Sequence, residues 1–101
     1  MLSYFTDELP PAIQSVIQSP AGTTFEQIAN QAVSALTMLD SPDVQSTAGQ
    51  SVLVFLQGRG DSRQQEFVDR ALQVMDKFPN YPRPRAAVAL QALKTLAQKA
   101  S

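Results

Sequence analysis

The stretch SPDVQSTAGQSVLVFLQG, residues 41–58, decides the fold. Ser41 followed by Pro42 is typical of a helix start, because serine accepts bonds from free amides and proline suits the first helical position. Apolar residues then recur at helical spacing, and Gly58 suits the position after a helix end. Residues 51–56 alone would also fit a buried strand, but no other segment could pair with them. We therefore predict a helix, and its apolar residues on every side predict a central, heavily buried one.

On both sides of this stretch, proline and glycine residues divide the chain into five segments with helical periodicity. The first segment is short, and each of the others is long enough for about four helical turns. Short connections favour antiparallel neighbours. We predict an all-α fold: a compact bundle of four main helices plus a short N-terminal helix, in a single helical domain covering residues 1–101. Ahead of the first helix, Leu2, Tyr4 and Phe5 are expected to pack as an N-terminal arm.

Two further helix starts carry capping patterns. Residues 23–26, Thr-Thr-Phe-Glu, fit a capping box in which a threonine hydroxyl reaches a helix amide and the glutamate reaches back. Asp61 or Ser62, followed by Gln64 or Gln65, predicts the start of the fourth helix in the same way. The apolar stripe of that helix is expected to contain Val68, Ala71, Leu72, Met75 and Phe78, with Phe67 and Val74 at its edge.

The composition excludes several chemistries. The chain contains no cysteine and no histidine, so disulfides, thiol catalysis, thiolate zinc sites and imidazole acid–base catalysis are excluded. We therefore predict no enzyme, with no catalytic residues, no metal ligands and no cofactor. We expect no secretion leader, because no basic-then-apolar segment opens the sequence, and no apolar run reaches about 18 residues. The expected location is the cytoplasm, without membrane association.

Charge is distributed unevenly along the chain, although the net charge is only −1. Residues 1–58 contain five acids and no lysine or arginine, whereas residues 59–101 contain eight cations and four acids. Opposite charges in the two parts could attract each other between copies of the chain. Self-association, for example as a homodimer, is therefore a reasonable expectation.

The segment Tyr81-Pro82-Arg83-Pro84-Arg85 is the most unusual local feature. Its prolines stiffen the chain and lower the entropy lost on binding. Two arginines at a helix N-terminus are disfavoured by the helix dipole, but a carboxylate or phosphate would meet both guanidinium groups and free amides there. We predict that Arg83 and Arg85 bind an anionic partner and that Tyr81 is an apolar anchor. The alternative is an exposed loop whose arginines serve solubility alone.

These observations favour a non-catalytic helical protein–protein interaction module of unknown pathway. Its partner would be a protein with an anionic patch, or a second copy of the chain. The alternative is nucleic-acid binding through the basic C-terminal segment, with contributions from Lys77, Lys94 and Lys99. The calculated isoelectric point of about 5.1 makes nucleic acid the less favoured partner. A third hypothesis is an enzyme that uses only carboxylates and arginines.

The Ala-, Gln- and Leu-rich helices and the stretch from Pro79 to Leu93 resemble small uncharacterised all-helical proteins of cyanobacteria. This resemblance implies a cytoplasmic, helical protein without an assigned activity. It assigns no role to any individual residue.

Overall fold

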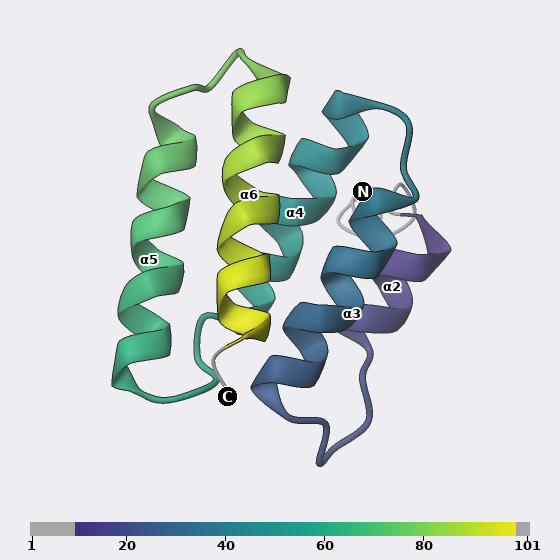
Figure 1. Cartoon of the computed structure of the whole chain (residues 1–101), viewed down its shortest axis with the longest axis vertical. Helices are drawn as coiled ribbons and strands as arrows, with labels where there is room; N and C mark the ends of the chain where they lie inside the picture. The colour runs from purple at the N-terminus through teal and green to yellow at the C-terminus, as the bar shows by residue number, and fades with distance from the viewer. Residues whose placement is uncertain (1–9, 99–101) are drawn as a thin grey trace, which may run out of the picture.

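The computed structural model describes residues 10–98, and this part of the chain forms five α-helices and no strand. The predicted all-α bundle of four main helices and a short N-terminal helix is confirmed. The predicted N-terminal arm of Leu2, Tyr4 and Phe5 lies outside the described residues. The helices, labelled as in Figure 1, are α2 (Pro11–Ile17), α3 (Phe25–Thr37), α4 (Pro42–Leu56), α5 (Ser62–Asp76) and α6 (Pro82–Ala97).

A capping box starts α3, but its members differ from those predicted. The Thr24 hydroxyl accepts a 3.1 Å hydrogen bond from the amide of Gln27, whose side-chain oxygen accepts a 2.9 Å bond from the Thr24 amide. Thr23 instead donates its hydroxyl to the carbonyl of Pro20 and closes the preceding turn. The cap therefore lies one residue later than predicted, and the reciprocal partner is Gln27 rather than Glu26.

The start of α5 fits the predicted pattern and also links two helices. Asp61 accepts a 2.8 Å bond from the amide of Gln64, and the Gln64 side chain returns a 2.8 Å bond to the Asp61 amide. The buried amide group of Gln64 also donates to the carboxylate of Glu26 at 2.8 Å. Glu26 therefore ties the first turn of α3 to the first turn of α5.

The ambiguous stretch 51–56 is helical and belongs to α4. The Ser41 hydroxyl lies 3.5 Å from the Val44 amide at the start of this helix, and Gly58 adopts a φ of +92° just after its end. As predicted, α4 is central: it contacts each of the other four helices. The helix is also heavily buried, as predicted, although Val54 is 51% exposed; its buried residues are Ser46, Ala48, Gly49, Val52, Leu53 and Leu56.

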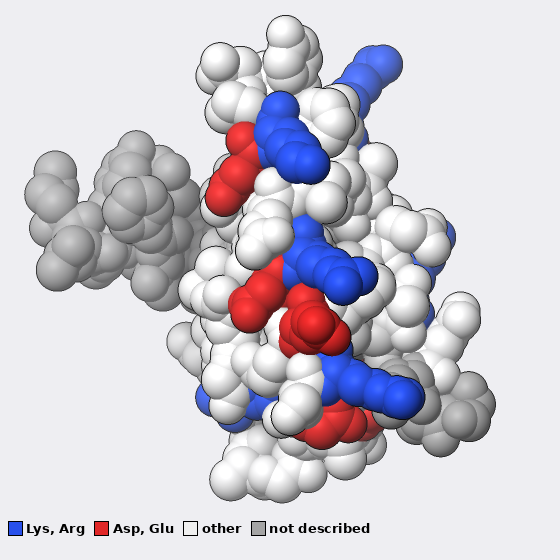
Figure 2. Space-filling model, turned by 90° about the vertical axis from the view of Figure 1, so that its left-hand side faces the viewer, with Lys and Arg blue, Asp and Glu red and all other residues white. Residues whose placement is uncertain are grey.

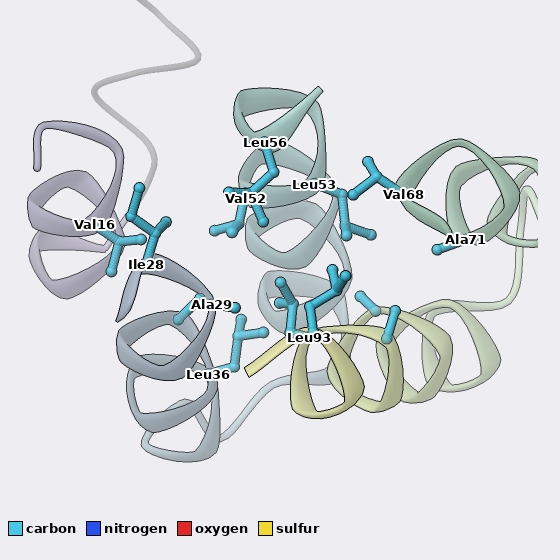
Figure 3. Packing of buried hydrophobic residues seen from close by; sticks show 14 of the residues in the cluster. Val16, Ile28, Ala29, Leu36, Val52, Leu53, Leu56, Val68, Ala71 and Leu93 are labelled. Carbon is cyan, nitrogen blue, oxygen red and sulfur yellow. The ribbon is translucent and has the colours of Figure 1, made fainter. Parts of the chain in front are cut away.

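The core is built mainly around α6. This helix lies between α3 and α5 and packs against α4, whereas α2 covers α3 and α4 from the outside (Figure 1). Figure 3 shows apolar side chains from all five helices pointing toward one another. The largest fully buried side chains are Ile13, Leu36, Leu53, Leu56, Met75, Leu93, Val52 and Val68.

Glycine at position 49 allows α4 and α6 to approach closely. A β-carbon placed on Gly49 would lie 2.6 Å from the β-carbon of Ala89, closer than two such carbons can come. Both residues are fully or nearly fully buried. The contact between the two most extensively packed helices therefore depends on this glycine–alanine pair.

Candidate interaction surface

The segment Tyr81–Arg85 is the N-terminal turn of α6 rather than a loop. Tyr81 is the N-cap residue and is 61% exposed, and Pro82 and Pro84 occupy the first turn. Proline is tolerated there because first-turn amides have no intrahelical acceptor. The amide of Arg85 donates to the carbonyl of Tyr81. Among the first residues of α6, only the Arg83 amide is left for an anion.

The Arg85 side chain points into the protein and joins three helices. Its Nε donates to the hydroxyl of buried Ser46 at 3.0 Å, and its Nη2 donates to Oε1 of Gln50 at 2.7 Å; both acceptors lie on α4. Its Nη1 donates to the main-chain carbonyl of Met75 on α5 at 2.8 Å. The guanidinium is therefore used in tying α6 to α4 and α5.

The two predicted arginines lie on different sides of α6. Exposed Arg83 borders a hollow against α3 and α4 that Leu36 and Gln45 also line. Arg85 borders a separate polar hollow with Asp43 and Ser46. The structure therefore does not bring the two guanidinium groups together into one anion-binding site, although Tyr81 and Arg83 both remain on the surface.

A different surface feature lies between α5 and α6, which run antiparallel (Figure 1). It is a mainly apolar groove with a volume of about 540 Å³. Phe67 and Val74 of α5 are 37% and 38% exposed at this groove. The other lining residues are Arg70, Ala71, Ala87, Val88, Gln91 and Ala92.

The groove extends beyond this volume. A smaller hollow of about 170 Å³ shares Phe67 and is also lined by Arg63, Thr95 and Leu96. From Arg63 to Val74 the helix rises by about 16 Å. The combined surface, called the α5–α6 groove below, is therefore long enough to contact about three turns of another helix.

Two arginines line the α5–α6 groove, and Glu66 lies beside them. Glu66 lines an adjoining hollow of about 270 Å³ that shares Arg63, Phe67 and Arg70 with the groove. Arg63 and Arg70 are its only charged lining residues, and neither side chain makes an ion pair or hydrogen bond within the described part of the chain. Asp69 instead accepts a 3.1 Å bond from Gln57 at the end of α4, on the other side of α5. Figure 2 shows a column of cations along this side of the molecule, with acids beside and between them.

The groove was not predicted from the sequence, because Phe67 and Val74 were expected at the edge of the core stripe. A signal was present: Phe67 and Val74 are seven residues apart, as are Arg63 and Arg70. Seven residues are close to two helical turns, so each pair lies on one side of α5. The spacing alone could not show that α6 would leave this side uncovered.

Other kinds of site find little support in the described residues. Within residues 10–98, no group of three His, Cys, Asp or Glu side chains is arranged to hold a metal ion. None of the described helices is both long enough and apolar enough to cross a membrane. The C-terminal cation Lys99 lies outside the described residues, and Lys77, Arg83 and Lys94 are exposed.

Comparison with known proteins found no match to this chain. No protein-family model matches the chain, and neither the search of curated proteins nor the search of solved structures found a match.

Proposed function

We propose that this protein is a non-catalytic helical interaction module that binds a partner protein carrying an anionic patch. The observation that carries this proposal is the α5–α6 groove, where exposed apolar side chains lie beside two arginines that have no partner within residues 10–98. Apolar side chains and arginines are enriched at protein interfaces, because the former release water and the latter recognise carboxylates. A second copy of the chain is one candidate partner, and the proposed location is the cytoplasm.

Tyr81 and Arg83 are a secondary contact in this proposal. Both are exposed at the start of α6. Arg85, the third predicted contact, has its guanidinium committed to Ser46, Gln50 and Met75. Its contribution to binding in this proposal is therefore to hold α6 in position.

Nucleic-acid binding is the alternative function. Arg63, Arg70 and Lys77 are exposed and spaced seven residues apart along α5, so they could contact successive phosphates. The apolar lining of the groove has no counterpart in a phosphate backbone, and this favours a protein partner.

The two functions are separated by capture from host lysate with and without nuclease. The tagged wild-type protein is compared with Arg83→Glu and with an Arg70→Glu/Val74→Gln double variant. A discrete protein band that resists nuclease supports the interaction module. Bands that vanish with nuclease, or recovered nucleic acid whose binding falls steeply with salt, would favour the alternative. Arg85 is left unchanged in these variants, because its loss would disturb the fold.

A further inference from the structure

We propose that the α5–α6 groove receives a single amphipathic α-helix of the partner, with acidic residues bordering its apolar stripe. This inference rests on the proposed interaction function and specifies its ligand. An amphipathic helix in an apolar groove is a recurrent mode of peptide recognition, in which anchors recur at i, i+3 or i+4, and i+7.

The shape of the surface fits a helix. Two antiparallel helices leave a furrow between them, and a third helix can lie along it in contact with both. Phe67 and Val74 project at its border, seven residues apart on α5. Two anchors on the incoming helix at a matching spacing of two turns could pack against them.

The α6 side of the furrow permits close approach. Its lining residues there include Ala87, Val88 and Ala92, which are small or branched close to the backbone. Small side chains allow two helix backbones to approach more closely than leucine or phenylalanine would. Large apolar anchors of the partner would therefore fit on the α6 side, where this protein supplies little volume.

The charge of the surface selects an acidic partner. Arg63 and Arg70 lie one above the other at the border. No carboxylate lines either hollow of the groove, although Glu66 lines the adjoining hollow with both arginines. α6 itself contains no aspartate or glutamate. A helix with glutamates beside its apolar stripe would meet both guanidinium groups, whereas a helix with lysines there would meet two like charges against the single carboxylate of Glu66.

Other ligand classes fit this surface less well. A peptide in extended conformation is normally recognised at a sheet edge, and residues 10–98 form no strand. A nucleic acid would use the arginines but would leave Phe67, Val74 and Val88 without apolar partners.

The test uses three synthetic peptides labelled with fluorescein and the full-length protein. The acidic probe carries leucines at i, i+3, i+4 and i+7 over about four turns, with glutamates on the flanks. A second peptide replaces each glutamate by lysine, and a third scrambles the acidic sequence. Fluorescence anisotropy should show that the acidic probe binds at least about tenfold more tightly than either control peptide, a difference of about 1.4 kcal/mol.

Variants locate the binding site. Arg70→Glu should weaken binding of the acidic probe about tenfold or more. Arg59→Glu makes the same change of charge outside the groove, because Arg59 lines neither hollow and lies over the Phe55 ring instead. It should leave the affinity within about twofold, well below the tenfold loss of about 1.4 kcal/mol. Val74→Gln should lower the affinity for the acidic probe without changing the net charge of the protein. Circular dichroism confirms that each variant is folded before its affinity is interpreted.

Three results would overturn the inference. One is equal affinity for the acidic and lysine peptides, and another is loss of binding by Arg59→Glu but not by Arg70→Glu. The third combines two observations: no peptide binds, and sedimentation shows concentration-dependent self-association that Arg70→Glu abolishes. The groove would then be occupied by a second copy of the chain. If a nuclease-resistant partner is still captured by Arg70→Glu/Val74→Gln, the interaction function stands and the groove assignment is wrong.

Discussion

Arg85 of α6 donates a 2.8 Å hydrogen bond from Nη1 to the main-chain carbonyl of Met75, in the last turn of α5. The final carbonyls of a helix have no intrahelical partner, and a cation near them is favoured by the helix dipole. Arg85 is unfavourably placed at the start of its own helix, but it is favourably placed at the end of its neighbour. The Arg85 guanidinium, which was predicted to bind an anionic partner, thus stabilises the junction of α5 and α6.

Replacing Arg85 by methionine should destabilise the protein by about 2–3 kcal/mol. The variant retains apolar volume but removes three hydrogen bonds and leaves the hydroxyl of buried Ser46 without its donor. Urea denaturation followed by circular dichroism measures the loss.

The matched control for this change is Arg83→Met, two residues away on the exposed side of α6. Its effect should remain within about 0.5 kcal/mol, as is usual for surface positions. Equal destabilisation by the two variants would contradict the structural role of Arg85.

Gly49→Ala should destabilise the protein by about 1–2 kcal/mol, even though alanine is the better helix former by about 1 kcal/mol. The new β-carbon would collide with that of Ala89, which has no rotatable side chain to move aside. The double variant Gly49→Ala/Ala89→Gly should recover much of the loss, because it exchanges the two side chains across the same contact. Thr47→Ala, on the exposed side of α4, serves as the control. If the double variant is no more stable than Gly49→Ala, the predicted collision is wrong.

Asp61→Ala should lower stability by about 1 kcal/mol through loss of the α5 cap. Asp61 accepts the Gln64 amide, and Gln64 in turn reaches Glu26 on α3. Amide hydrogen exchange should therefore accelerate in the first turns of both α5 and α3. If hydrogen exchange accelerates in α5 alone, the link to α3 is weak. The control is the neighbouring change Ser62→Ala, which should have little effect on exchange in either helix.

Arg70→Glu should change the free energy of unfolding by no more than about 0.5 kcal/mol. The side chain is exposed and has no partner within residues 10–98, so reversing its charge removes no internal contact. Thermal unfolding of the variant beside wild type provides the measurement. A large loss of stability would mean that Arg70 has a structural partner and would make it unsuitable as a probe of binding.

Much of the fold could be predicted from the sequence because its signals are local. Pro42 and Gly58 mark the ends of α4, and the Asp61–Gln64 spacing marks the start of α5. The position of the α3 cap was off by one residue, because two adjacent threonines offered equivalent hydroxyls and only the preceding turn distinguishes them.

The candidate site was less predictable because it depends on which faces meet. Arg83 and Arg85 are two residues apart, so on a helix they point in widely different directions, and only packing decides which one is buried. The partners of Arg85 lie 10, 35 and 39 residues earlier in the chain, at Met75, Gln50 and Ser46. No local pattern indicates contacts at such separations.

The central position of α6 also affects how the protein is made. Translation releases helices α2 to α5 before α6, and domains form during synthesis from the N-terminal end. Until α6 emerges, the faces of α3, α4 and α5 that it covers stay open to water. Nascent chains arrested before Leu93 should therefore bind chaperones that recognise apolar segments, and this affinity should disappear once α6 is complete and docked.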